Sequence, residues 1–452
     1  MTVSAGLVIA APASGSGKTV FTLGLLRSLA RSGVAVVSAK TGPDYIDPAF
    51  HAAASGRPCI NLDPWAMRPG TLDAAAAELL NQSDLVICEG VMGLFDGATV
   101  TDGSTADLAQ RLGWPVILVI DAHAQAASAA AVVRGFATHR PGLAVAGVVF
   151  NRVGSAGHAA ILREACALAL PEIPVLGCVP RAQGLAVPSR HLGLVQALEH
   201  PDLEVFLDRA AELIANHVDG AALRRIAGTL KPGQRLARAN DGAASLPHPR
   251  PLPPLGQRIA VAGDVAFAFS YPLVTAGWRA AGAEILPFSP LADEAPAADS
   301  DAVYLPGGYP ELHPGRLAGN ERFIAGVHAA ARRGAAVFGE CGGYMVLGDG
   351  LIDGDGTRHR MLGLLPLETS FAERGLHLGY RAAALAVGTV LGGTGARFRG
   401  HEFHYATVIR EGPGQALFAC ADASGRALGH IGLVAGTVMG SFLHLIDAED
   451  VH

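Results

Sequence analysis

Long apolar runs and clusters of basic residues are both missing from this sequence of 452 residues. No run reaches the roughly 20 apolar residues that a membrane-spanning helix requires, so no membrane partner is expected. No basic region precedes the apolar stretch near the N-terminus, and we therefore expect no signal peptide. The 34 Lys and Arg residues are outnumbered by 40 Asp and Glu residues, and without a basic cluster nucleic acid is not an expected partner either.

Cysteine is also scarce, and its six positions (59, 88, 166, 178, 341 and 420) show none of the short spacings of metal-binding motifs. Scattered free thiols are typical of a reducing compartment, which predicts a cytoplasmic protein in which most of these side chains are small core residues. The oligomeric state stays open, with a homodimer as the candidate assembly.

Apolar residues, by contrast, make up half of the chain and come in short runs. In the first half these runs alternate with helical patterns. Strands are expected at 6–11, 34–40, 84–90, 115–121, 143–151 and 174–180, and helices from about 124, at 156–170 and at 204–217. This alternation predicts an α/β fold with a doubly wound parallel sheet, in which ligands bind at the carboxyl ends of the strands.

The alternation breaks at 229–257, where prolines recur at 247, 249, 251, 253 and 254. Neither a helix nor a central strand tolerates this density of proline. We therefore interpret 229–257 as a linker between an N-terminal domain (1–228) and a C-terminal domain (258–452).

The C-terminal domain opens with a second α/β pattern. Its strands are expected at 258–263, 284–288, 302–305 and 335–340, and its helices at 271–281 and 315–333. From about Thr369 the chain is richer in glycine and in β-forming residues, which favours antiparallel strands.

The stretch Ala10–Thr19, A-A-P-A-S-G-S-G-K-T, joins the first expected strand to an amphipathic helix. Its glycines let backbone N–H groups surround phosphate oxygens, Lys18 adds a cation and the Thr19 hydroxyl can bind Mg²⁺. Pro12 stands where the usual pattern has its first glycine, so this is a variant P-loop. A turn that ends in Gly-Lys-Thr by chance would not explain the flanking strand and helix. The expected ATP contacts are Ser14, Gly15, Ser16, Gly17, Lys18 and Thr19.

Polar side chains follow further strands of the same sheet. Asp44 and Asp47 lie in the loop T-G-P-D-Y-I-D-P, Glu89 ends an apolar strand, and Asp96 stands between two glycines. Mg²⁺ prefers one or two carboxylates together with phosphate oxygens and water, so these groups are candidates for holding metal or substrate. The alternative for Asp44 and Asp96 is that they only cap turns. Asn151 could read the adenine edge of ATP, or could be a plain turn residue.

The strand expected at 335–340 runs directly into Cys341, which is flanked by Glu340 and two glycines. Such a turn resembles a nucleophile elbow, and a helix beginning there is expected to lower the thiol pKa. The backbone N–H groups of Gly308 and Gly342 could form an oxyanion hole, and His444 is the candidate base. Cysteine with a distant histidine indicates acyl transfer through a thioester. A buried structural cysteine is the alternative, while His401 and His404 are interpreted as structural or substrate-facing.

Six motifs together resemble the cobyrinic acid a,c-diamide synthase family, including its members that act on metal-free hydrogenobyrinic acid, over essentially the whole chain. They are A-P-A-S-G-S-G-K-T at 11–19, T-G-P-D-Y-I-D-P at 41–48, C-E-G-V-M-G-L-F-D-G at 88–97, P-S-R-H-L-G-L at 188–194, L-P-G-G-Y-P-E at 305–311 and G-E-C-G-G-Y at 339–344. The first half is similar to dethiobiotin-synthetase-like P-loop enzymes, and the second to class I glutamine amidotransferases.

The resemblance implies an ATP- and glutamine-dependent ligase of cobalamin biosynthesis. Glutamine would be hydrolysed at Cys341 through a thioester, releasing ammonia. ATP with Mg²⁺ would phosphorylate a corrinoid side-chain carboxylate, and ammonia would displace the phosphate, at the c and then the a side chain. A carboxylate is not amidated by ammonia at neutral pH without such an activated leaving group. The expected Mg²⁺ ligands are Thr19, Asp47 and Glu89, and the expected substrate contacts are Asp44, Tyr45 and Asp96, with roles inside this group left open.

One position departs from the wider amidotransferase pattern. Ordinary members place a glutamate two residues after the histidine, and here that residue is Ile446. This is similar to the dyad form of the cobyrinic branch. What orients His444 stays open, with Asp447 as a candidate partner.

Two alternatives to the a,c-diamide synthase reading remain at this stage. One is the related cobyric acid synthase, which amidates other side chains, although the P-D-Y-I-D-P loop favours the a,c enzyme. The other is a ParA/MinD-like ATPase switch, which usually carries a lysine where this chain has Ser14 and would leave the Cys341 region unexplained. The substrate stays open between cobalt-containing cobyrinic acid and metal-free hydrogenobyrinic acid; the Ala-, Gly- and Arg-rich composition hints at the metal-free route.

Overall fold

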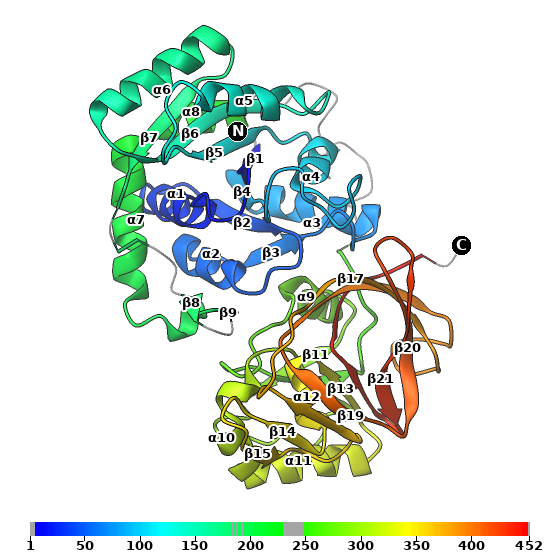
Figure 1. Cartoon of the computed structure of the whole chain (residues 1–452). Coiled ribbons are helices and arrows are strands. Elements are labelled where there is room, and N and C mark those ends of the chain that lie inside the picture. Colours follow the sequence, from blue (N-terminus) through cyan, green and yellow to red (C-terminus); the bar gives the residue numbers. More distant parts are fainter. Residues whose placement is uncertain (1–4, 183, 186–188, 191–192, 229–247, 451–452) are drawn as a thin grey trace. The chain divides into compact units, whose positions relative to one another are not determined.

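The computed structural model describes residues 5–182, 184–185, 189–190, 193–228 and 248–450, which divide into two compact units (Figure 1). The first unit runs to Trp65 and resumes at Leu72, and the second consists of Ala66–Thr71 together with the chain from His248 onward. None of the helices in the described ranges is long and apolar enough to cross a membrane.

The first unit is built on a seven-stranded sheet with the order β3-β2-β4-β1-β5-β6-β7. Its strands are β1 (Ala5–Ala10), β2 (Val36–Thr41), β3 (Cys59–Leu62), β4 (Leu85–Glu89), β5 (Val116–Asp121), β6 (Val145–Val153) and β7 (Val175–Pro180). Every neighbouring pair is parallel. The central strands are buried almost without interruption, as expected where helices cover both faces of a sheet. The doubly wound parallel sheet predicted from the sequence is confirmed.

The helices of this unit include four that the sequence pattern does not predict, namely α2, α3, α4 and α8. The full set is α1 (Lys18–Arg31), α2 (Asp47–Ser55), α3 (Pro69–Asn81), α4 (Thr105–Leu112), α5 (Ala129–Thr138), α6 (Ala156–Ala169), α7 (Leu203–His217) and α8 (Gly220–Ala227). The loop predicted to be irregular at 41–48 ends in the first turn of α2. The reason is local: the Asp44 carboxylate accepts hydrogen bonds from the N–H groups of Ile46 and Asp47 (2.9 and 3.0 Å) and so starts the helix.

The second unit is built on a mixed ten-stranded sheet with the order β11-β10-β12-β13-β22-β21-β20-β17-β18-β23. The parallel part contains β10 (Arg258–Ala262), β11 (Glu284–Phe288), β12 (Ala302–Leu305), β13 (Ala336–Glu340) and β22 (Val438–Ser441). The antiparallel part contains β17 (His377–Leu385), β18 (Arg397–His404), β20 (Gln415–Asp422), β21 (Ala427–Ala435) and β23 (Leu443–Ala448). The antiparallel character predicted after Thr369 is confirmed.

Helices and a small second sheet complete this unit. The helices are α9 (Pro272–Ala280), α10 (Pro314–Gly319), α11 (Glu321–Arg332) and α12 (Gly342–Leu347), and the small sheet contains β15 (Arg358–Arg360), β14 (Gly350–Ile352), β16 (Leu367–Ser370) and β19 (Thr407–Glu411). The single helix predicted at 315–333 is wrong. It is interrupted at Asn320, whose backbone is not helical and whose amide donates to the Pro290 carbonyl (2.6 Å).

The proline-rich segment expected to be a linker is only partly described. Residues 229–247 lie outside the described residues. The part from His248 onward packs into the second unit, where Leu252 and Leu255 are buried and the Pro253 carbonyl accepts from the indole N–H of Trp278 (3.0 Å). Leucines placed among the prolines therefore give this segment an apolar face.

Candidate active sites

The P-loop begins where β1 ends and places its backbone around the N-terminus of α1. Gly15 and Gly17 have φ of 79° and 88°, a region that side chains with a Cβ rarely adopt. A Cβ on Gly17 would lie 2.1 Å from the Asn151 Nδ2 atom. That Nδ2 donates to the Ser16 carbonyl (3.0 Å), and the Ser16 hydroxyl donates to the Ala13 carbonyl (2.8 Å). Asn151 thus holds the loop through its hydrogen bond to Ser16. Neither prediction for Asn151, an adenine contact or a plain turn residue, includes it.

A cavity of about 580 Å³ lies against this loop. Its lining includes nine of the residues predicted as ATP, Mg²⁺ or substrate contacts, namely Ser14, Gly15, Gly17, Lys18, Thr19, Asp44, Asp47, Glu89 and Asn151. Tyr45 and Asp96, both in described loops, lie outside this lining. Asp96 accepts a hydrogen bond from the Gly93 N–H (2.8 Å), so it does cap a turn, as the structural alternative proposed.

Lys18, the first residue of α1, is almost fully buried although it carries a charge. Its ammonium donates to the carbonyl of Met92 (2.5 Å) and is 3.5 Å from that of Ala13. Burial lowers the pKa of Lys18, while the negative charge of Glu89 acts in the opposite direction. A cation held by neutral carbonyls beside a glycine loop can exchange those partners for phosphate oxygens, which bind it more strongly.

Three of the predicted groups converge on the ammonium of Lys40, a residue that the sequence analysis does not single out. The Lys40 Nζ atom lies 2.5 Å from Asp47 Oδ2 and 3.0 Å from Glu89 Oε1. The Thr19 hydroxyl donates to the same Glu89 oxygen (2.8 Å) and is 3.4 Å from the same Asp47 oxygen. A hydroxyl and two carboxylates form the hard oxygen-donor set that Mg²⁺ prefers. The residues present therefore fit a magnesium ion.

In the buried cluster of Lys40, Asp47 and Glu89, the opposite charges of the side chains compensate one another. Burial would raise the pKa of Glu89, but the Lys40 cation and the hydrogen bond from His51 hold it well below the usual value. Burial, followed by the charge of Asp44, raises the pKa of Asp47 to about 6. Lys40 is fully buried, yet the surrounding carboxylates raise its pKa well above the usual value.

His51 on α2 is a second group missing from the sequence analysis. Its Nε2 atom lies 2.7 Å from the second Glu89 oxygen, and its Nδ1 atom lies 3.6 Å from the Cys59 sulfur. Burial would lower the pKa of His51, but Cys59 and Glu89 raise it to about 10. The histidine therefore fixes one Glu89 oxygen and leaves the other for Lys40 and Thr19. A lysine within an apolar strand and a histidine one turn after Asp47 were the available sequence signals.

The second site is formed at the turn between β13 and α12. Cys341 has φ 48° and ψ −106°, a backbone conformation that L residues rarely adopt. Its N–H donates to the Ser441 carbonyl (2.8 Å), which fixes the turn against β22. This is the elbow geometry predicted from the glycines around the cysteine.

The side chains of Cys341 and His444 meet at Gly307. A Cβ built on Gly307 would lie 2.3 Å from the His444 Cε1 atom and 3.2 Å from the Cys341 Cβ atom. A Cβ on Gly342 would in turn lie 3.0 Å from the Gly308 nitrogen. The structure therefore brings the predicted nucleophile and base together, with the two predicted oxyanion amides beside them.

Burial sets the protonation states of this pair. It raises the pKa of the Cys341 thiol, and the charge of Glu311 acts in the same direction. Burial, with smaller contributions from His401 and His404, lowers the pKa of His444 to about 3. The expectation that α12 lowers the thiol pKa is therefore wrong, because the cost of burying a thiolate outweighs the short helix. At neutral pH the pair is a thiol and a neutral imidazole, which can accept the thiol proton.

Asp447, the residue suggested as a partner of His444, is bound to Arg68. Asp447 is fully buried and accepts hydrogen bonds from Arg68: from the backbone N–H (2.8 Å), from Nε (3.1 Å) and from Nη2 (2.9 Å). The carboxylate whose charge raises the pKa of His444, against the larger effect of burial, is Glu402.

Comparisons with known proteins match both halves of the chain. The model for the CobQ/CobB/MinD/ParA nucleotide binding domain matches residues 7–195, and the model for the CobB/CobQ-like glutamine amidotransferase domain matches residues 258–451. The first match contains the P-loop cavity, and the second contains the Cys341 elbow.

Full-length relatives are similar to this chain as well. It is 54% identical over 442 residues to the hydrogenobyrinate a,c-diamide synthase of Sinorhizobium sp and 54% identical over 445 residues to that of Brucella suis biovar 1, covering 98% of each chain in both alignments. It is 53% identical over 449 residues to the enzyme of the same name from Rhizobium meliloti, covering 98% of this chain and 100% of that one.

Proposed function

This chain belongs to the hydrogenobyrinate a,c-diamide synthase family, and we propose that it amidates the a and c side-chain carboxylates of hydrogenobyrinic acid, using ATP and glutamine, in cobalamin biosynthesis. The observation that carries the proposal is that one chain holds two chemically complementary sites. The P-loop cavity is lined by groups suited to ATP and Mg²⁺, and Cys341 and His444 converge at Gly307. The names of the relatives favour hydrogenobyrinic over cobyrinic acid as the substrate.

In the second unit, the reaction begins with glutamine. His444 takes the proton of the Cys341 thiol as sulfur adds to the carboxamide carbon, and the oxygen of the tetrahedral intermediate faces the N–H groups of Gly308 and Gly342. The proton on His444 passes to the leaving nitrogen, so ammonia departs and a glutamyl thioester remains. Water then cleaves the thioester to glutamate and restores the thiol. Because the resting thiol is protonated, this proton transfer accompanies substrate binding rather than preceding it.

In the first unit, the P-loop amides and Lys18 hold the phosphates of ATP, and Asn151 holds the loop through the Ser16 carbonyl. Thr19, Asp47 and Glu89 would hold Mg²⁺, which supplies positive charge to the phosphates when bound. The corrinoid carboxylate attacks the terminal phosphorus, giving an acyl phosphate and ADP. Ammonia then attacks the acyl carbon, and phosphate leaves as the amide forms.

Other assignments extend this proposal. Asp44, Tyr45 and Asp96 are proposed as corrinoid contacts; for Asp44 the support is its place in the cavity lining. A cytoplasmic location fits the free, buried cysteines of the described residues. A homodimer without nucleic-acid partners also remains a proposal, which sedimentation of the purified protein would test.

The direct test is amide formation measured by mass with ATP, Mg²⁺ and glutamine. Hydrogenobyrinic acid and cobyrinic acid are offered side by side at equal concentration. The proposal expects two amides on hydrogenobyrinic acid, formed faster than on cobyrinic acid. Four added amides would indicate the cobyric acid synthase reaction instead, and no added amide on either substrate would require a different acceptor carboxylate.

A further inference from the structure

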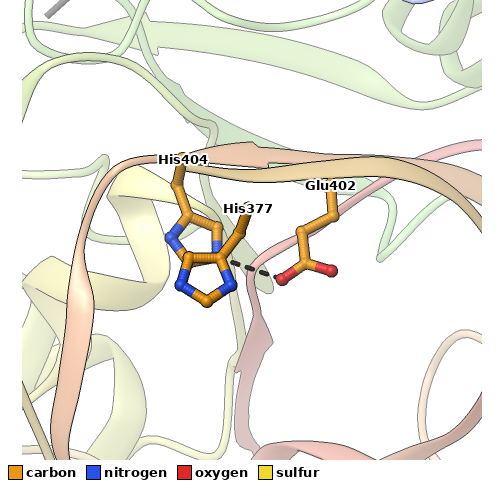
Figure 2. A group of neighbouring side chains, drawn as sticks. All are labelled: His377, Glu402 and His404. Atoms are coloured by element: carbon orange, nitrogen blue, oxygen red, sulfur yellow. Dashed lines mark hydrogen bonds and ion pairs between the residues drawn. The ribbon is translucent and has the colours of Figure 1, made fainter. Parts of the chain in front are cut away.

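Outside the Cys341–His444 pair, three metal-ligating side chains meet on one face of the large sheet of the second unit (Figure 2). His404 and Glu402 are two residues apart on β18, so they share a face. His377 on β17 is the direct cross-strand partner of His404. The potential ligand atoms of the three all lie within 4.8 Å of one another. Strand alternation and register, rather than a loop, therefore hold this group.

Both ring nitrogens of His404 face oxygen atoms. Its Nδ1 atom lies 3.1 Å from the Ala406 carbonyl oxygen, and its Nε2 atom lies 3.0 Å from Glu402 Oε1. Both partners are acceptors, whereas a neutral imidazole offers one N–H and one lone pair. With Nδ1–H donating to the carbonyl, the Nε2 lone pair faces a carboxylate. Either a proton or a metal ion must lie between these two atoms.

The distances suit a metal ion. In a tetrahedral zinc site the bonds to nitrogen and oxygen are about 2.1 Å, which places ligand atoms about 3.4 Å apart. The separation of 3.0 Å between Nε2 and Oε1 is close to that value. The ring of His377 stacks on that of His404, with centroids 4.6 Å apart and planes within 9°. Because His377 is exposed, its ring can turn its nitrogen toward the same point, and an ion can enter from solvent.

We infer that His377, Glu402 and His404 form a three-ligand site for a divalent transition metal of the zinc class, with at least one coordination position left to water. Two imidazoles and one carboxylate favour such a borderline ion over Mg²⁺, which prefers oxygen ligands alone. The site is therefore distinct in chemistry from the oxygen-donor cluster of the first unit. It stands independently of which corrinoid the enzyme uses.

Arg381 opposes metal binding at this point. Its guanidinium pairs with the other Glu402 oxygen, Oε2, at 2.8 Å. The guanidinium therefore leaves Glu402 Oε1 to face His404, while its positive charge repels a metal ion at the same place. Replacing Arg381 by a neutral residue should therefore strengthen metal binding at this site. Adventitious binding elsewhere on the protein would not respond to that change.

The test is zinc binding to the full-length protein, measured by competition with a chromophoric chelator in excess Mg²⁺. The wild-type protein is expected to bind one equivalent of zinc. His377→Gln should bind it at least about 100-fold more weakly, because one ligand is lost. Glu402→Gln, which keeps the shape but removes the charge, should weaken the same equivalent. His359→Gln is the matched control, because His359 pairs with a single carboxylate, that of Asp353 (2.7 Å), and it should bind like wild type.

Two further measurements separate a metal site from a shared proton. Arg381→Gln should bind zinc more tightly than wild type, and Co²⁺ should give visible ligand-field bands in wild type that are absent in His377→Gln. Unchanged zinc affinity in both His377→Gln and Glu402→Gln would overturn the inference. So would weaker binding in Arg381→Gln, or a wild-type protein that binds no zinc.

Discussion

At the scale of single residues, the ammonium group of Lys40 lies between the carboxylates that are proposed to bind Mg²⁺. Lys40 lies between Asp47 and Glu89, within 3.0 Å of an oxygen of each, and all three are buried. Without a cation these carboxylates would repel each other in a medium that screens charge poorly. The position of Lys40 therefore explains how the cluster folds before any metal binds.

Lys40→Met tests this explanation. Removing one partner of a buried ion network leaves uncompensated charge, which typically costs about 3–5 kcal/mol. We expect a loss of that size in the free energy of unfolding, measured by urea denaturation in the presence of a chelator. Added Mg²⁺ should restore part of it, because the metal can supply the missing charge between the two carboxylates.

Arg27→Met is the matched control for that experiment. Arg27 pairs with Glu204 and Asp208 at the edge of the same unit and is partly exposed. Such pairs contribute about 0–1 kcal/mol, so this variant should unfold nearly like wild type and show no added response to Mg²⁺. Equal losses in the two variants would contradict the role given to Lys40.

His444 makes stability depend on pH in a defined direction. Its folded pKa is lowered to about 3 by burial, whereas an unfolded histidine titrates near 6.5. Between these values the unfolded chain binds a proton that the folded chain does not. Stability therefore falls as pH falls through this window, by up to about 1.4 kcal/mol per pH unit.

His444→Gln should remove that contribution. Over pH 6.5 to 4, its free energy of unfolding should fall less steeply than that of wild type, as followed by urea titrations at each pH. His430→Gln, which changes an exposed histidine on β21, should keep the wild-type slope. Parallel slopes for wild type and His444→Gln would mean that the imidazole is already charged in the folded state.

At the scale of elements, the sequence predicts the ends of a strand best where one short apolar run forms one strand. β11 and β12 begin and end at the predicted residues, 284–288 and 302–305. Short elements between polar loops escape: α2 begins after a turn fixed by the Asp44 carboxylate, and the four residues of β3 are too few to show a pattern. The break at Asn320 depends on a contact with the Pro290 carbonyl, which lies 30 residues away in sequence. The order of the antiparallel strands likewise depends on non-local pairing.

The residues of the candidate sites also divide into those that local motifs predict and those that depend on distant contacts. Lys18, Thr19 and Cys341 come from local motifs, and the structure places them at the ends of their strands as predicted. Lys40 and Asp447 could not be assigned in this way. Lys40 looks like one polar residue in an apolar strand, and the partner of Asp447 is Arg68, which lies 379 positions earlier. A pairing across that separation leaves no signal in one sequence.

A prediction at the scale of elements concerns Gly307, in the turn after β12. Gly307→Ala would place a Cβ 2.3 Å from the His444 ring, so the imidazole must move away from Cys341. Glutamine hydrolysis should fall by about 100-fold or more, since general base catalysis typically contributes 10²–10⁴-fold. Ammonium-dependent amidation should persist. Gly319→Ala in α10, where a Cβ would meet open space, is the control and should keep full glutaminase activity. Retained hydrolysis in Gly307→Ala would remove His444 from the mechanism.

At the scale of the whole molecule, the two units divide one reaction, and two substitutions should reveal the division. Each unit has its own sheet and core, so a change in one site should leave the other folded. Cys341→Ser removes the thiolate nucleophile, and glutamine-dependent amidation should disappear while amidation with added ammonium continues. Lys18→Ala removes a phosphate contact, and amidation should be lost with either nitrogen source. Failure of ammonium to rescue Cys341→Ser would show that the two sites do not act in sequence, because acyl phosphate formation would then depend on the cysteine itself.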